Sequence, residues 1–265
     1  MSPRIQLDSA SPQAIDGRQV RAATFQKVRL GYVIDTMKRL GIDAVSRKVL
    51  VVGGGRGILP SGLARQGFDV TAVDPSGSAT TMARAAAERD GLAIVYRTAP
   101  AEDLGAVEGS FDVAYYADTF EITSDLERVI EHAAGALATG GVLFYDTVNR
   151  TLLSRLVYLG MFQRIPMTRI MPRGRYAADR LRRPDELAEV LERYGLHNED
   201  VCDFKPKNAL GLLNGVRALR RGAITDEQIA AMVDFVLNPD GRPVVTYLGY
   251  ARKRLKLPAP DNVRR

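Results

Sequence analysis

Short apolar runs alternate with segments of helical periodicity through the first half of the chain. Four runs rich in Val, Ala, Ile and aromatic residues have the length and composition of buried strands: 49–52, 69–73, 93–96 and 111–116. The segments between them, such as 79–89, place apolar residues three and four positions apart, as one face of a helix does. Strands and helices that alternate in this way form parallel βαβ units. The pattern therefore predicts an α/β protein with a doubly wound parallel sheet.

Helical periodicity also precedes the first predicted strand. Apolar residues over 22–40 predict a helix which, with the polar residues before it, forms an N-terminal helical cover over 1–40. A fifth strand is predicted at 141–147 and a closing strand at 244–251. These segments fit one domain over 1–265.

The pattern changes between the fifth and the closing strand. Residues 152–183 combine apolar side chains with eight arginines and a single acid, Asp179. Residues 210–242 predict a helical insertion with two helices, at 210–220 and 226–237. We expect the first of these segments to form a basic lid and the second to shape the pocket beneath it.

Composition narrows the class of protein. The 265 residues are 46% hydrophobic and 26% charged, as in ordinary globular proteins with one core. No apolar leader and no run of roughly 18 apolar residues occurs, so a cytoplasmic protein is expected. Cys202, the one cysteine, has no partner for a disulfide. The net charge of +6 is accompanied by no aromatic-rich basic stripe or zinc pattern, so nucleic acid is not an expected partner.

The first predicted strand runs directly into a glycine-rich loop. Gly53, Gly55 and Gly57 alternate with other residues, and Asp74 ends the next strand. Glycines let a main chain come close to a nucleoside, and a carboxylate after the second strand accepts hydrogen bonds from ribose hydroxyls. A dinucleotide fingerprint needs its third glycine where this chain has Ile58, which disfavours a nucleotide-binding oxidoreductase. The G-x-G-x-G spacing is typical of S-adenosylmethionine-dependent methyltransferases.

Several separated motifs resemble the O-methyltransferases of ubiquinone biosynthesis, the 3-demethylubiquinol 3-O-methyltransferase family. They are Arg29-Leu-Gly-Tyr32, the glycine region 49–59, Phe111-Asp-Val113 with Asp118 and Glu121, Thr147-Val-Asn-Arg150, Pro172-x-Gly174, Pro184-x-Glu186-Leu187 and the last strand around Tyr247. The resemblance covers about 29–252 without the insertion at 210–242. It implies the Rossmann-like, seven-stranded sheet of class I methyltransferases, with S-adenosylmethionine as cofactor.

The same resemblance implies which residues hold the cofactor. Arg29 would reach the methionine carboxylate, for which a guanidinium is a bidentate partner. Gly53 would lie against the cofactor's backbone, and Asp74 would hold the ribose. The remaining expected cofactor-binding residues are Gly55, Gly57, Ala101 beside the adenine and Ala117 on the pocket wall. Many methyltransferases carry an acid before that first alanine, where this chain has Pro100, so an adenine contact would come from main chain or from Glu102.

Two positions depart from the family pattern. Val51 stands where most class I methyltransferases place an acid two residues before the first glycine, which removes a partner for the methionine ammonium group. Ile122 stands where the family has a histidine beside two acids. The acids are kept as Asp118 and Glu121, which we predict to act as the catalytic base or to bind a divalent metal. Capping and surface charge are the alternative interpretation.

Further side chains are candidates for the acceptor site or for packing alone. Asp146, near the end of the fifth strand, is a third carboxylate that would face a substrate. Tyr176 and Tyr247 would either shape an aromatic acceptor site or pack in the interior. The two histidines, His132 and His197, lie outside the matching motif, and we expect structural roles for them.

The predicted reaction is transfer of a methyl group to the hydroxyl of a small aromatic or quinone-like acceptor. A phenol with a pKa near ~10 needs a base or a metal to become a nucleophile. The departures at Val51 and Ile122 leave open a methyltransferase fold used for a non-methylating step such as cyclisation. For the lid at 152–183 we expect contact with an anionic membrane, a solvated basic face or binding of an anionic substrate. The acceptor's identity and the oligomeric state are not predicted.

Overall fold

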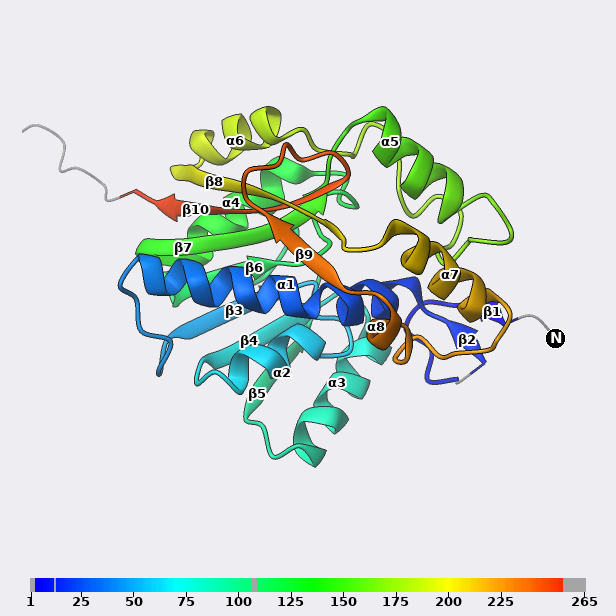
Figure 1. Cartoon of the computed structure of the whole chain (residues 1–265). Helices are drawn as coiled ribbons and strands as arrows, with labels where there is room; N and C mark the ends of the chain where they lie inside the picture. Colours follow the sequence, from blue (N-terminus) through cyan, green and yellow to red (C-terminus); the bar gives the residue numbers. More distant parts are fainter. Residues whose placement is uncertain (1–2, 12, 106–108, 255–265) are drawn as a thin grey trace, which may run out of the picture.

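The computed structural model describes residues 3–11, 13–105 and 109–254, which are built around one eight-stranded sheet (Figure 1). The strand order is β5 (Ile94–Thr98), β4 (Asp69–Asp74), β3 (Lys48–Val52), β6 (Phe111–Tyr116), β7 (Leu137–Val148), β10 (Thr246–Lys253), β8 (Leu196–Pro206) and β9 (Phe235–Asn238). The strands from β5 to β7 are parallel, and the others pair antiparallel. The order reverses between β3 and β6, where α/β sheets bind ligands at their carboxyl ends.

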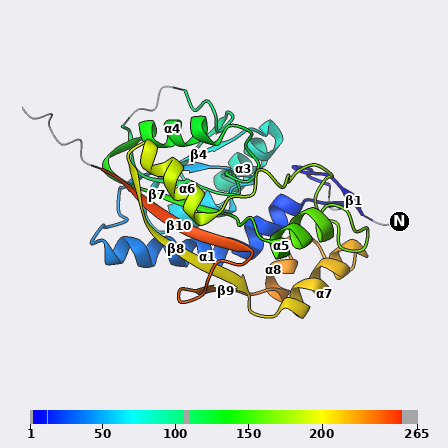
Figure 2. The same cartoon turned by 90° about the horizontal axis from the view of Figure 1, so that it is seen from above.

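Successive residues of β3 pack on opposite faces of the sheet. Val49 and Val51 belong to a core with α1 (Gly17–Arg39), α2 (Ile58–Ala64) and α3 (Gly77–Arg89). Leu50 and Val52 belong to a core with α4 (Leu126–Ala136) and α6 (Pro184–Arg193). Figure 2 shows α1 and α4 on opposite sides of the sheet. Because both faces of β3 are covered, its sequence is apolar throughout rather than alternating.

The α/β class is confirmed, but the predicted sheet is wrong in two respects. Among the described residues it has eight strands rather than seven, because β9 extends the edge beyond β8. It is also mixed rather than parallel throughout, because β10, β8 and β9 run antiparallel to their neighbours. Antiparallel neighbours can be joined without a crossover helix, and the connection from β9 to β10, at 239–245, contains none.

The predicted helix at 226–237 is wrong. Helix α8 covers only Ile229–Met232, and the chain then extends as β9. The ring centroid of Phe235 lies 4.7 Å from that of Phe25 and 6.0 Å from that of Phe204, so this strand covers an aromatic cluster above α1. Pairing with β8 satisfies the backbone groups that a helix would otherwise bond internally. The first helix of the insertion is confirmed as α7 (Ala209–Arg220).

The helix of the N-terminal cover begins earlier than predicted. Helix α1 begins at Gly17 rather than at residue 22, because the Asp16 carboxylate accepts hydrogen bonds from the amides of Arg18 and Gln19 and caps the helix. Before it, β1 (Arg4–Ile5) and β2 (Ala14–Ile15) form a two-stranded parallel pair. The outermost ends of the single domain predicted over 1–265 lie outside the described residues.

The basic segment 152–183 begins as α5 (Leu152–Ser154) and η1 (Arg155–Met161), a π-helix, and continues without a further helix or strand. Figure 1 shows α5 and α7 at the same end of the sheet. Arg182 donates to the main-chain oxygen of Phe120 at 2.8 Å, and Arg180 donates to that of Ile122 at 2.8 Å. Part of the positive charge in this segment therefore ties it to the turn after β6.

Within the described residues, none of the helices combines the length and the apolar character that a bilayer-spanning segment needs.

Candidate functional site

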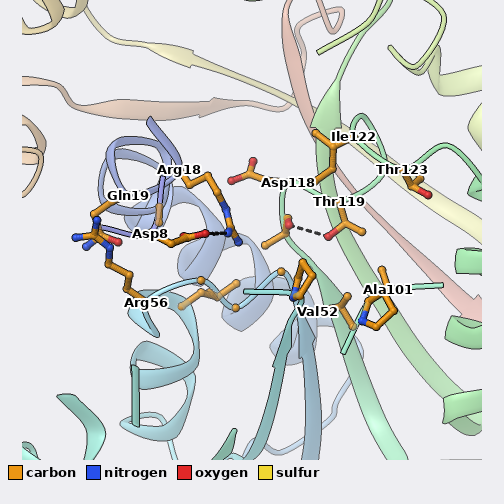
Figure 3. A pocket seen from close by; sticks show the side chains of 18 of the residues that line it. Asp8, Arg18, Gln19, Val52, Arg56, Ala101, Asp118, Thr119, Ile122 and Thr123 are labelled. Atoms are coloured by element: carbon orange, nitrogen blue, oxygen red, sulfur yellow. Dashed lines mark hydrogen bonds and ion pairs between the residues drawn. The ribbon is translucent and has the colours of Figure 1, made fainter. Parts of the chain in front are cut away.

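A cavity of about 190 Å³ opens at the carboxyl ends of the parallel strands. Its wall includes the residue that ends β3 and residues that follow β4, β5 and β6, and side chains of α1 lie across it (Figure 3). The sequence-predicted residues that line it are Arg29, Gly53, Gly55, Ala101, Ala117 and Asp118. Three other predicted residues, Gly57, Asp74 and Glu121, are not part of this wall.

Gly53 makes the closest main-chain approach in the cavity. It has φ 78°, and a Cβ atom there would lie 2.2 Å from the carbonyl oxygen of Ala117. Only glycine fits this position. Gly57 has φ 87°, and a Cβ atom there would lie 2.6 Å from the Tyr96 hydroxyl, so its small size serves the packing of α2 and α3 rather than the cavity wall.

Replacing Gly53 with alanine should lower the free energy of unfolding by about 1–3 kcal/mol, because the new methyl group strains the backbone and displaces Ala117. Urea denaturation measures this loss. Gly31→Ala in α1 is a matched control, since a Cβ atom there meets nothing within 4 Å. The control should keep or raise stability, by up to about 1 kcal/mol. Equal losses in the two variants would contradict the steric argument.

Asp74 accepts from three donors of the protein itself. Its Oδ1 accepts from the amide of Ser76 at 2.9 Å, and its Oδ2 accepts from the amide of Gly55 at 2.9 Å. The guanidinium of Arg18 pairs with the same Oδ2 and donates to both oxygens of Asp8 at 3.0 Å (Figure 3). Asp74 is only 1% exposed. Arg18 therefore covers the carboxylate that the sequence predicts for a ribose.

Arg29 lies buried between two carboxylates. Its Nη2 donates to Asp146 at 2.7 Å and lies 2.9 Å from an oxygen of Asp118. The Tyr115 hydroxyl donates to the other oxygen of Asp146 at 3.0 Å. The Nε of Arg29 is buried and has no hydrogen-bond partner among the described residues. Arg29 also lines the cavity.

A second arginine of α1, Arg21, extends this cluster away from the cavity. Its guanidinium pairs with Asp118, lies 3.1 Å from Glu121, and donates to the Tyr176 hydroxyl at 2.9 Å. Thr147 donates to the other oxygen of Glu121 at 3.1 Å. Glu121 is fully buried. Of the two acids predicted at the pocket, only Asp118 reaches it.

Burial and neighbouring charges separate the pKa values of these acids. Burial raises the pKa of Asp146 to about 7, with Arg29 opposing the rise and Asp118 adding to it. Burial also raises the pKa of Glu121, against the effect of Arg21. Burial opposes ionisation of Asp118 too, but Arg21 and Arg29 outweigh it and hold its pKa well below the usual range. Asp118 is therefore ionised, while its neighbour Asp146 takes up a proton near neutral pH.

Replacing Asp146 with asparagine should change how stability depends on pH. The pKa of Asp146 is higher folded than unfolded, where it is about 3.9, so between these values the folded state binds more protons and stability falls as pH rises. The variant lacks this fall. Its unfolding free energy relative to the parent should therefore increase from about pH 4 to about pH 7 and then level off. A difference in urea denaturation that stays constant over this range would contradict the assignment.

The carboxylate cluster does not fit a metal ion. In the described part of the chain, no three His, Cys, Asp or Glu side chains come together as a metal-binding group. Asp118 and Glu121 face guanidinium groups instead, and that positive charge opposes a cation at the same oxygens. We therefore derive no step through a metal.

Glu102 and Ile122 line the cavity, whereas the other candidates lie outside its wall. Val51, at the position of the missing acid, is fully buried in the core beneath α1. Tyr247 donates its hydroxyl to the main-chain oxygen of Arg182 at 3.0 Å, and Tyr176 is buried against Arg21. His197 is exposed and lies 3.2 Å from Glu192.

Sequence reasoning missed the charged residues of the N-terminal cover. Asp8, Asp16 and Arg18 of the cover line the cavity together with Arg56 of the glycine-rich loop, and Asp16 pairs with Arg56 at 2.9 Å. The sequence does contain a feature that points to them. Asp16 is a favourable N-cap residue, and a helix predicted to begin after it would have included Arg18.

Comparisons with known proteins agree with this architecture. Residues 25–201 match the family described as Methyltransferase domain. The chain is 32% identical over 183 residues to the ubiquinone biosynthesis O-methyltransferase of Rhizobium etli, covering 66% of this chain and 73% of the relative. It is 34% identical over 190 residues to the protein of that name from Xylella fastidiosa, covering 71% and 74%. The magnesium protoporphyrin IX methyltransferase of Synechocystis PCC 6803, solved with bound SAH, shares the fold at TM-score 0.57 and 16% identity, over 89% of this chain and 86% of that one.

Proposed function

Because the chain belongs to the methyltransferase family, we propose that it transfers a methyl group from S-adenosylmethionine to a hydroxyl of a small aromatic or quinone-like acceptor. The observation that carries the proposal is the glycine at the cavity wall. The Ala117 carbonyl oxygen occupies the place of a Cβ atom at Gly53, so this part of the cavity wall is bare main chain that a flat or extended ligand can approach. The relatives named as O-methyltransferases support oxygen as the accepting atom.

The residues around the cavity fit the cofactor's functional groups. The free Nε–H of Arg29 would bind the methionine carboxylate, and Gly53 and Gly55 would lie along the cofactor's chain. Ala101 would lie beside its adenine, and the main chain at Ala117 would line the pocket. Asp74 would hold the ribose once Arg18 moves aside. When bound, S-adenosylmethionine supplies an electrophilic methyl group, so the protein has to position the acceptor oxygen and accept its proton.

Asp118 is the proposed acceptor of that proton. It is the acid of the buried cluster that lines the cavity, and Arg21 and Arg29 orient it from behind. An ionised carboxylate with a low pKa binds a proton weakly on its own. Asp146 lies behind it, shares Arg29 and has a pKa raised to about 7, so while Asp146 is ionised the pair has room for the one proton that leaves the acceptor hydroxyl. Glu121 supports the site indirectly, because it fixes Arg21.

Calorimetric titration with S-adenosylmethionine and S-adenosylhomocysteine tests the function, followed by methyl transfer to a panel of catechols and hydroquinones. Micromolar binding of both compounds with transfer to at least one phenol is the expected result. Failure to bind either compound would overturn the proposal. Binding without transfer to any acceptor would favour the non-methylating use of the fold that Val51 and Ile122 suggest.

Contact of the lid with an anionic membrane is a further part of the proposal. Leu152, Leu153 and Leu156 are 83%, 46% and 57% exposed on α5 and η1, and Arg155 lies among them. Exposed apolar side chains enter a bilayer interface, and each arginine near anionic lipid contributes on the order of 1 kcal/mol. Flotation with anionic vesicles should show salt-sensitive association that Leu156→Glu weakens. Absence of any association would exclude the membrane contact.

A further inference from the structure

The charged side chains that line the cavity are mostly paired with one another. Among the described residues they are four carboxylates and four guanidiniums: Asp8, Asp16, Glu102, Asp118, Arg18, Arg29, Arg56 and Arg175. Arg18 pairs with Asp8 at 3.0 Å, Arg56 with Asp16 at 2.9 Å and Arg29 with Asp118 at 2.9 Å. Glu102 accepts a hydrogen bond from the Thr123 hydroxyl at 2.5 Å. Arg175 is left.

The Arg175 side chain has neither a hydrogen bond nor an ion pair within the described residues, and its Nε is shielded from solvent. A buried N–H without an acceptor costs about 1–3 kcal/mol, and more where the group is charged. A ligand that brings an acceptor to this guanidinium would recover that cost. Because the guanidinium is a planar fork, a carboxylate is the partner that matches it best.

The main chain holds Arg175 on the acceptor side of the cavity. Tyr176, the next residue, accepts a hydrogen bond from Arg21, and its amide and carbonyl are both bonded to the side chain of Gln163. Arg21 in turn pairs with Asp118. The adenosine end expected for the cofactor lies elsewhere, at the ends of β4 and β5. Arg175 and Asp118 therefore belong to the same end of the site.

We propose that the acceptor carries a carboxylate, and that Arg175 binds this group while the hydroxyl to be methylated lies at Asp118. The proposal rests on the proposed methyltransferase function. A carboxylated acceptor would also explain the excess of arginine over acid in 152–183, because a positively charged segment attracts an anionic substrate to the cavity. Arg175 is then a specificity-determining residue that distinguishes carboxylated from neutral phenols.

The test compares two rings that differ by one carboxylate. The protein, saturated with S-adenosylhomocysteine, is titrated by calorimetry with catechol and with 3,4-dihydroxybenzoate. We expect the benzoate to bind at least about tenfold more tightly, as one charge-assisted bidentate contact allows. Arg175→Gln should abolish this preference and leave the affinity for S-adenosylhomocysteine unchanged. Arg173→Gln, at an exposed position two residues away and outside the cavity wall, should retain the preference.

Each other result has a defined meaning. Equal affinity for the two rings, or no binding of either, overturns the proposal. If Arg175→Gln instead weakens S-adenosylhomocysteine about tenfold, Arg175 binds the cofactor and the proposal is also wrong. If the parent protein does not bind S-adenosylhomocysteine at all, the proposed methyltransferase function itself fails, which the cofactor titration reveals before either ring is added.

Discussion

Replacing Arg29 with methionine should lower the free energy of unfolding by about 3–5 kcal/mol, because it leaves the buried Asp146 carboxylate without its nearest cation and leaves Asp118 paired with Arg21 alone. Arg29 is 2% exposed, and Asp146, 2.7 Å from its Nη2, is fully buried. Methionine fills much of the same volume, so the loss in free energy of unfolding measures the missing charge rather than a cavity in the core. Urea denaturation near pH 8 measures it.

The pH dependence of this loss distinguishes charge from packing. Without Arg29 the pKa of Asp146 rises further above about 7, so at about pH 5.5 this acid is neutral and needs no partner. The destabilisation should therefore be smaller at about pH 5.5 than at pH 8. Adding Asp146→Asn to the variant should restore part of the stability at pH 8. The same loss at both pH values would contradict the electrostatic account.

Replacing Arg18 with methionine should tighten the binding of S-adenosylhomocysteine by about tenfold, because it uncovers Asp74. In the parent, both Arg18 and the Gly55 amide occupy Oδ2 of Asp74, which leaves little capacity for two ribose hydroxyls. The cofactor therefore has to displace a charge-assisted ion pair before its ribose binds. Calorimetric titration of variant and parent measures the gain.

Arg65→Met is the matched control for Arg18→Met. Arg65 also pairs with an aspartate, Asp90, but both side chains are about half exposed and lie away from the cavity wall. The control should bind S-adenosylhomocysteine as the parent does. Weaker binding by the Arg18 variant would mean that Arg18 holds the cofactor rather than competing with it.

The central parallel strands could be predicted because β3 and β6 are buried on both faces and are therefore almost entirely apolar. In β3, Val49 and Val51 meet one core and Leu50 and Val52 the other. The strand at Phe235–Asn238 could not be predicted in the same way. It lies at the edge of the sheet, and its conformation depends on the free edge of β8 and on Phe25, more than 200 residues earlier in the chain.

Part of the candidate site could also be predicted from the sequence, and part of it could not. The glycine spacing and the acids Asp74 and Asp118 were visible in the sequence, because a loop that approaches a nucleoside needs those residue types close to a strand end. Val51 lies in the core and Val52 lines the cavity. Successive side chains of a strand point to opposite faces of the sheet, and α1 covers the face on which Val51 lies.

Local order along the chain sufficed for the α/β class, the glycine loop and the type of cofactor, because helices, strands and such loops depend on residues a few positions apart. The state of the site's charges depends on pairs that lie far apart in the chain. Arg18 reaches Asp74 across 56 residues, and Arg29 reaches Asp146 across 117. Only the folded chain brings these groups together. The tertiary structure alone therefore decides that Arg18 covers Asp74, that Glu121 is buried against Arg21, and that the Nε of Arg175 is buried without a partner among the described residues.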